Sequence, residues 1–240
     1  MADDAELSGQ IAQVADATTR LLASLDELAG IDPGRPTLCE GWTAGHVLTH
    51  LARNADGMRG CAEGAQRDEV VAMYESLDAR SRDIDAGAGR PMAELIADVT
   101  TASRALAEVW SALDAQQWSR QMLHQRGPLP LSATPGLRLG EVEIHHIDLM
   151  GSFGPADWPQ AFVASLLPED GELAQRAPDG VGLDVQATDT GATWSSGPGG
   201  SRRVSVAGPA WAVAAWMTGR SGPAQAALTV TGGELPVLKP

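Results

Sequence analysis

The chain has 240 residues, 43% of them hydrophobic and 20% charged, so it can form one large or two modest folded domains and is not a disordered chain. Its net charge of −14 argues against binding to nucleic acid or an anionic membrane surface, because both are polyanions. No apolar run approaches the ~18 residues that a membrane span needs. The acidic start, Met1–Glu6, lacks the basic and apolar parts of a secretion signal. We therefore expect a cytoplasmic protein and, by default, a monomer.

The first ~150 residues are predicted to be helical. Apolar residues recur at helical spacing over Leu7–Leu28, and Gly30–Pro36 interrupts the pattern. A second helix is predicted to start with Thr43 as its N-cap and to reach Gly60 or Gly64.

Two further helices complete this half. The strongest amphipathic pattern covers Met92–Leu113, and a fourth helix is predicted over Leu137–Met150. The charge-rich segment Asp78–Asp85 is predicted to be a solvated turn or a fraying helix end. Breaks rich in glycine and proline are expected at Gly87–Pro91, Gly127–Pro130 and Thr134–Gly136. Four helices joined in this way indicate a four-helix bundle.

After Gly151–Pro159, a linker rich in glycine and proline, the pattern changes. A helix is predicted over Phe162–Arg176, and a shorter one begins at Pro209 and ends near Gly219. A flexible turn is predicted at Gly197–Ser201. Alternating apolar and polar residues predict strands at Val181–Ala187, Ala192–Ser196, Arg203–Ala207 and Ala227–Thr231. The predicted fold class is therefore α plus α+β, with a bundle over residues 1–152 and a small α+β domain over residues 160–240.

The histidines carry the main chemical signal. Four of the five lie in two short helical stretches, with His46 and His50 in the first, and His145 in the second four residues after Glu141. Positions i and i+4 share a helix face, so Glu141 and His145 can point at one place, and His50 or His46 could complete a three-ligand site. Two histidines and one carboxylate are typical of a catalytic zinc or iron site. The alternative is that the Glu141/His145 pair is a chance surface pair and that the histidines are ordinary core or surface residues.

Three segments resemble the mycothiol-dependent maleylpyruvate isomerase family. They are Glu40–Ala55, Glu141–Leu149 and Trp216–Arg220, and they occur in the family's order. The resemblance extends over the whole chain and implies a DinB-like four-helix bundle that holds a divalent metal, usually zinc, followed by a small C-terminal α+β domain. The motifs are more specific for the fold and the metal than for the reaction.

The resemblance also implies roles for individual residues. His50, Glu141 and His145 match the family's metal ligands, and Arg220 matches an arginine that the family uses at its active site. Because the substrate is an anion in an acidic protein, the metal and Arg220 would supply the local positive charge. Without the resemblance, Arg220 could equally be an arginine that favours a helix C-terminus.

Other residues near these motifs receive no direct role. His46 is predicted to lie behind the ligands or in the core, and His146 to lie in the core or at the surface. Gly140 departs from the polar or basic residue that precedes the glutamate in the isomerases. Cys39 and Cys61 are expected to be reduced thiols and not nucleophiles. The seven tryptophans are predicted to be core residues.

The implied activity is that of an enzyme, a metal- and mycothiol-dependent cis–trans isomerase. A metal-activated mycothiol thiolate would add to the cis double bond of maleylpyruvate, and rotation and elimination would then give fumarylpyruvate and regenerate mycothiol as a cofactor. Two alternatives stay open. The same site would serve a mycothiol S-transferase that acts on another electrophile. The protein could also be a non-catalytic small-ligand binding protein, although the complete ligand set and Arg220 argue against this.

Overall fold

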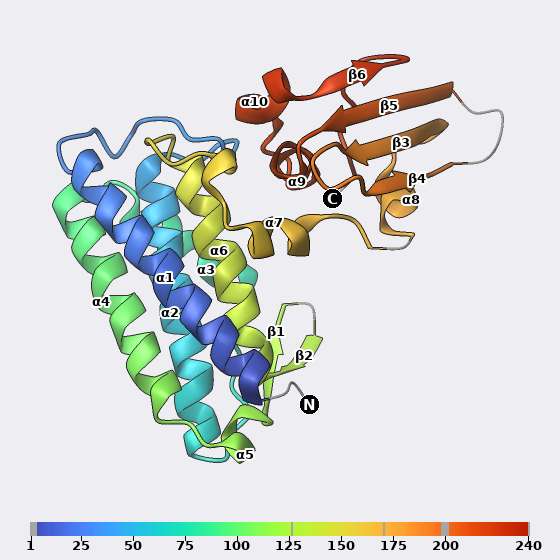
Figure 1. The fold of residues 1–240 in the computed structure, drawn as a ribbon. Helices are drawn as coiled ribbons and strands as arrows, with labels where there is room; N and C mark the ends of the chain where they lie inside the picture. Colours follow the sequence, from blue (N-terminus) through green and yellow to red (C-terminus); the bar gives the residue numbers. More distant parts are fainter. Residues whose placement is uncertain (1–3, 126, 170, 198–201, 240) are drawn as a thin grey trace. The chain divides into compact units, whose positions relative to one another are not determined.

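The computed structural model describes residues 4–125, 127–169, 171–197 and 202–239. The chain divides into two compact units, Met1–Ser152 and Phe153–Pro240. The first unit is mainly helical, and the second contains a four-stranded sheet (Figure 1). Within the described ranges, no helix combines the length and the apolar character needed to cross a membrane. The predicted fold class, α plus α+β, is confirmed.

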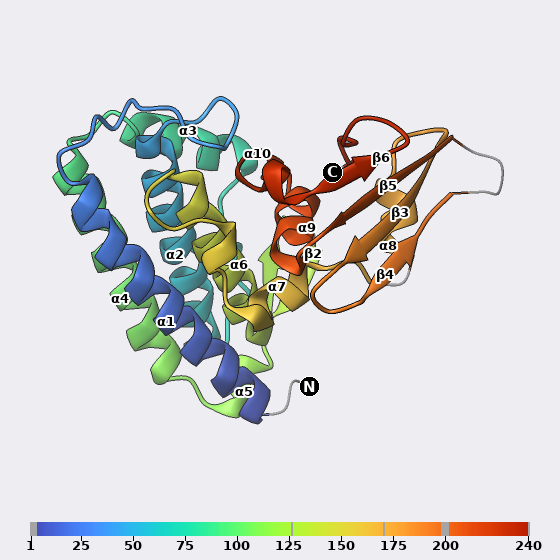
Figure 2. The ribbon, with the colours of Figure 1, turned by 45° about the horizontal axis from the view of Figure 1, so that its top comes forward.

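Four long helices form the bundle of the first unit and run alongside one another in both views (Figures 1 and 2). They are α1 (Asp4–Leu28), α2 (Ala44–Gln66), α4 (Met92–Ser111) and α6 (Thr134–Asp148). Helix α2 packs against α4 and α6, and α1 packs against the same two helices. Each helix therefore has two neighbours, and the apolar stripes meet in one core.

The core of the bundle matches the predicted helical spacing. Its fully buried side chains include Leu21, Leu25, Leu48, Leu51, Leu95 and Leu106. Burial of one leucine contributes roughly 1.5–3 kcal/mol, so this interior holds the helices in a fixed register. That register brings side chains of α2 and α6 to a common point.

The expectation of a solvated turn or fraying end at Asp78–Asp85 is wrong, because a complete helix, α3 (Leu77–Gly87), covers this segment. The Ser76 hydroxyl oxygen accepts a hydrogen bond from the Ala79 N–H at 3.0 Å and caps the helix. Ile84 is buried against the bundle. One side-chain cap and the burial of Ala79 and Ile84 therefore stabilise a helix that is rich in charged residues.

The segment between α4 and α6 contains more structure than the predicted loop. A short helix, α5 (Ala115–Trp118), precedes an antiparallel hairpin of β1 (Gln121–His124) and β2 (Gly127–Pro130), and a 3₁₀ turn, η1 (Leu131–Ala133), leads into α6. The predicted break at Thr134–Gly136 is instead the first turn of α6. Proline is tolerated there because the first-turn N–H groups have no partner inside the helix.

The helix predicted over Phe162–Arg176 is divided into two in the second unit. These are α7 (Gln160–Leu166) and α8 (Glu172–Arg176), and Pro168 separates them. Proline disfavours a helical conformation in the residue before it, and Leu167 is extended with φ −73° and ψ 150°. The predicted linker also contains a 3₁₀ turn, η2 (Pro155–Asp157).

The sheet of the second unit has the strand order β4-β3-β5-β6. Its strands are β3 (Val181–Ala187), β4 (Thr193–Ser195), β5 (Arg202–Gly208) and β6 (Thr229–Thr231). The central pair, β3 and β5, is parallel, and both edge pairs are antiparallel. All four strands lie within or next to predicted ones. Residues 198–201 of the predicted turn lie outside the described residues.

Helix α9 (Ala210–Met217) packs against β3 and β5 (Figure 2). It ends near Gly219, whose φ of +77° is the left-handed conformation that glycine adopts at helix ends. A short helix, α10 (Ser221–Ala224), and a 3₁₀ turn, η3 (Gln225–Ala227), lead to β6. The core of this unit is formed by Leu183, Val185, Val204, Val206, Val213 and Trp216.

Candidate metal centre

The three residues matched to metal ligands lie together inside the bundle. His50 comes from α2, and Glu141 and His145 lie one turn apart on α6. One ligand atom from each residue lies within 4.8 Å of the other two. His50 is 2% exposed and His145 is 9% exposed, so both imidazoles are held away from solvent.

The distances fit a shared ion. Oε2 of Glu141 lies 2.7 Å from Nε2 of His50 and 3.3 Å from Nε2 of His145. Ligand atoms around a tetrahedral zinc ion, with bonds of 2.0–2.1 Å, are separated by about 3.4 Å. The two imidazole rings meet edge to face, with centroids 4.7 Å apart. Two imidazole nitrogens and a carboxylate oxygen therefore form a donor set of the right type and spacing for a divalent metal.

Asp148 orients one of these imidazoles. Its Oδ2 lies 2.9 Å from Nδ1 of His145, and the carboxyl group is fully buried. A hydrogen bond from Nδ1–H to this carboxylate turns Nε2 of His145 toward Glu141, and the Nε2 lone pair becomes available once the ring is neutral. Sequence reasoning missed Asp148, although its position three residues after His145 on the same helix was a usable signal.

The charge states of the cluster suit a cation. Burial lowers the pKa of His50 to about 4, so this imidazole is neutral near pH 7. Burial opposes ionisation of Glu141, but hydrogen bonds from His145 and His50 hold its pKa well below the usual value. Burial also opposes protonation of His145, but Asp148 and Glu141 raise its pKa. A metal that binds here therefore competes with a proton on His145.

The two other histidines of the motifs lie outside this cluster, as expected. Nδ1 of His46 accepts a hydrogen bond from the Thr43 N–H at 3.2 Å, which caps the start of α2. His146 is buried, and its Nε2 lies 2.7 Å from the Ser24 hydroxyl of α1. Neither residue belongs to the group that His50, Glu141 and His145 form.

Trp42 and Arg80 border the cluster, and sequence reasoning assigned neither of them to it. The Trp42 ring lies 5.3 Å from the His50 ring and 6.1 Å from the His145 ring, between centroids. The Arg80 guanidinium lies 5.9 Å from the Trp42 ring centroid. Trp42 was predicted to be core, but it is half-buried against both imidazoles. Its place inside the first motif was the available signal, whereas Arg80 belongs to the helix that was not predicted.

Arg220 belongs to the second unit. It follows the C-terminal end of α9, where its backbone N–H donates to the Ala215 carbonyl and its Nη1 donates to the Thr218 carbonyl, both at 2.7 Å. The guanidinium thus contacts the carbonyl end of a helix, as expected for an arginine that favours a helix C-terminus. Its role toward a substrate stays a prediction.

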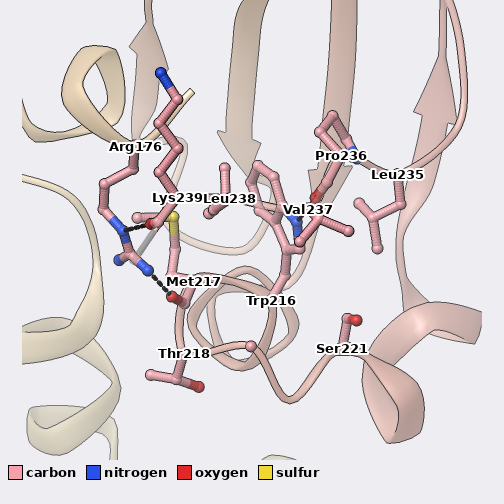
Figure 3. Close-up of a pocket in the computed structure, with 11 residues that line it drawn as sticks. Arg176, Trp216, Met217, Thr218, Ser221, Leu235, Pro236, Val237, Leu238 and Lys239 are labelled. Carbon is pink, nitrogen blue, oxygen red and sulfur yellow. Dashed lines mark hydrogen bonds between the residues drawn. The ribbon is translucent and has the colours of Figure 1, made fainter. Parts of the chain in front are cut away.

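Trp216, from the third motif, has a structural contact. Its indole Nε1 donates to the Pro236 carbonyl at 2.7 Å and attaches the C-terminal segment 235–239 to α9. Arg176 donates to the Met217 and Lys239 carbonyls on the same pocket (Figure 3). The pocket measures about 320 Å³, but Arg176 and Trp216 at its edge already donate to backbone carbonyls.

The fold and the cluster together define a class of protein, the DinB-like helical bundles that gather histidine and carboxylate side chains at one internal site. A family model described as "Mycothiol maleylpyruvate isomerase N-terminal domain" matches residues 14–150. The chain therefore belongs to the mycothiol-dependent maleylpyruvate isomerase family.

Two solved structures resemble the chain over both units. One is a crystal structure of the mycothiol-dependent maleylpyruvate isomerase, with a TM-score of 0.84, 25% identity, and coverage of 97% of this chain and 96% of that chain. The other is a histidine-to-alanine mutant of that isomerase, with a TM-score of 0.84, 24% identity and the same coverage. A search of curated proteins finds no significant match.

The two cysteines differ in their surroundings, and neither is in a disulfide. Cys61 is buried in α2 with its Sγ 3.6 Å from the Val71 carbonyl oxygen, and burial raises its pKa to about 11. Cys39 is partly exposed. The thiolate fraction of Cys61 near neutral pH is therefore far below that of an ordinary exposed thiol.

We expect a thiol reagent to label native protein at Cys39 only. A Cys39→Ser variant should react with no more than trace reagent at pH 8 until denaturant is added, and should then take up one equivalent at Cys61. Mass spectrometry of the labelled peptides checks this. Rapid labelling of Cys61 in the native variant would contradict the burial described here.

Proposed function

We propose that this protein is a mycothiol-dependent maleylpyruvate isomerase, which converts a cis-unsaturated keto acid to its trans isomer, fumarylpyruvate. The observation that supports this most is the convergence of His50, Glu141 and His145 within 4.8 Å, in a chain of this family. The substrate is a small anion, and a low-molecular-weight thiol, mycothiol, acts as the cofactor.

The donor set favours zinc. Two imidazoles and one ionised carboxylate are ligands that zinc accepts in catalytic sites, with a further position left for a reactant. A divalent metal held there supplies the positive charge that keeps the thiol of mycothiol as a thiolate near neutral pH. The side chains that hold it are His50, Glu141 and His145.

Other side chains prepare this site. Asp148 fixes the orientation of the His145 ring, so that Nε2 is held in position for a metal. The Trp42 ring lies beside both imidazoles. We assign Arg220 the binding of a substrate carboxylate, because a guanidinium binds carboxylates with two parallel hydrogen bonds.

The direct test measures metal content and turnover together. Purified protein should bind about one equivalent of zinc, and it should isomerise maleylpyruvate only when mycothiol is present. Removal of zinc with a chelator should abolish turnover, and added zinc should restore it. His50→Ala should lose both zinc and turnover, whereas His124→Ala, which changes a histidine of the β1 strand outside the cluster, should keep both.

The same experiment separates the alternatives. Stable mycothiol conjugates of other electrophiles, without isomerisation, would identify an S-transferase. The enzyme proposal would be disproved if the protein bound no zinc and if His50→Ala changed neither zinc content nor turnover.

The contact between Asp148 and His145 gives a further prediction. Asp148→Asn removes the negative charge that favours Nδ1–H on His145, and zinc affinity should fall roughly 10- to 100-fold. A competition titration with a chromogenic chelator measures this. Asp16→Asn, a change on the exposed face of α1, is the matched control and should have no effect. Equal affinities in the two variants would show that Asp148 does not orient the ligand.

A further inference from the structure

Among the described residues, Arg80 has no acidic partner, whereas most arginines of the bundle have one. Within the part of the chain that the structure describes, its contacts are His50, Tyr74 and Trp42. Its guanidinium lies 5.6 Å from the Tyr74 ring centroid and 5.9 Å from that of Trp42. Arg80 is therefore a half-buried cation beside the candidate metal centre in a protein of charge −14.

The contact with His50 defines the position of a proton. Nη2 of Arg80 lies 3.0 Å from Nδ1 of His50. A guanidinium has donors only, so Nδ1 is the acceptor, and the proton of the neutral ring lies on Nε2. That Nε2–H donates to Oε2 of Glu141 at 2.7 Å. His145 has the opposite arrangement, because its Nδ1 faces the carboxylate of Asp148.

Ligation of a metal by Nε2 of His50 is incompatible with this hydrogen bond. The Nε2 lone pair would then be used by the metal, and the single proton of the neutral ring would lie on Nδ1. Two donors, Nδ1–H and the Nη2–H of Arg80, would face each other at 3.0 Å. Arg80 must therefore leave His50 when the site is loaded, and its guanidinium then has free donors next to the metal ligands.

We propose that Arg80 is a substrate-binding residue of the bundle, which is released from His50 by metal loading and then binds a carboxylate of the substrate. This inference rests on the proposed function, since it takes the ligand to be a small dicarboxylate. The planar guanidinium, which contacts Trp42 and Tyr74, can offer two parallel N–H groups to a carboxylate.

The first test locates the ring proton without any turnover. Long-range ¹H–¹⁵N spectra of metal-free, histidine-labelled protein should show His50 with its proton on Nε2, and zinc should move it to Nδ1. In Arg80→Met, the metal-free ring should lose this preference. A metal-free wild-type protein with the His50 proton on Nδ1 would overturn the proposal.

The second test uses maleate as a stable dicarboxylate probe of the zinc-loaded protein. Calorimetry should show that Arg80→Met weakens maleate binding by about tenfold or more, because a charged hydrogen-bond pair is lost. Arg80→Lys should recover part of the affinity. Arg82→Met, which removes an exposed arginine two residues along α3, is the matched control and should bind maleate as the wild type does.

Zinc affinity distinguishes binding of substrate from support of His50. Arg80→Met should bind zinc at least as tightly as the wild type, because a cation and a competing hydrogen bond are removed. Weaker zinc binding by this variant would instead make Arg80 a support for the ligand and overturn the proposal. Unchanged maleate affinity in Arg80→Met would overturn it as well.

Failure of this inference is distinguishable from failure of the proposed function. Isomerase activity that persists with unchanged kcat/KM in Arg80→Met leaves the function intact and removes Arg80 from it. If the zinc-loaded protein has no isomerase activity but binds maleate in a manner that depends on Arg80, the role of Arg80 holds and the proposed function fails. A protein that takes up no zinc refutes both.

Discussion

Glu141→Gln is expected to weaken zinc binding by at least about 100-fold and to abolish turnover at micromolar zinc, because replacing even an outer partner of a zinc ligand costs roughly 10- to 100-fold. Glutamine keeps the volume of the side chain and one acceptor oxygen, but it replaces the other oxygen with an NH2 donor and removes the one negative charge among the three ligands. The carboxylate also accepts from both imidazoles, at 2.7 Å and 3.3 Å, so its charge organises the cluster before any metal arrives. Competition titration and kcat/KM for maleylpyruvate provide the measurements.

The matched control for this variant lies two residues further on the same helix. Glu143 is also buried, but it pairs with Arg20 of α1 on another side of α6. Glu143→Gln should lower stability without changing zinc affinity. A Glu141→Gln protein that binds zinc as tightly as Glu143→Gln would show that the cluster is not the metal site.

Gly45→Ala is expected to destabilise the protein by about 3 kcal/mol. Gly45 lies in the first turn of α2, and a Cβ at this position would be 1.9 Å from the Ala88 carbonyl oxygen. The obstacle is backbone, so α2 must move away from the end of α3 to relieve the overlap. Because His50 lies further along the same helix, zinc affinity should fall as well.

Gly60→Ala is the control for this second prediction. It lies on the same helix, but a Cβ there has no atom within 4 Å. Alanine should therefore stabilise α2 by about 0.5–1 kcal/mol through its higher helix propensity. Urea unfolding of the three proteins gives both values. Equal effects of the two substitutions would mean that helix propensity, not the contact with Ala88, governs Gly45.

The local parts of the fold were predictable from the sequence. The four long helices follow from apolar residues at helical spacing, and α9 begins after Pro209 and ends near Gly219 as predicted. The missed elements are those whose stability depends on distant contacts. Helix α3 has few apolar residues of its own, and the β1–β2 hairpin contains two prolines that suggested a loop.

The residues of the candidate site were likewise predictable only in part. Glu141 and His145 could be placed on one face because the helix repeat fixes the relation between positions four residues apart. The resemblance to the family selected His50 over His46, and the structure brings His50 to the other two, while His46 caps the start of α2.

The sequence by itself determined that the chain is acidic, that it forms four long helices, and that two of these helices carry three candidate metal ligands. Only the tertiary structure decided that Asp148 holds His145, that Trp42 lies beside the imidazoles, and that Arg80 donates to His50. The physical reason is the distance along the chain over which each kind of interaction acts. Helical periodicity and capping act over one or two turns, whereas the neighbours of a buried imidazole are set by the packing of α2, α3 and α6 against one another.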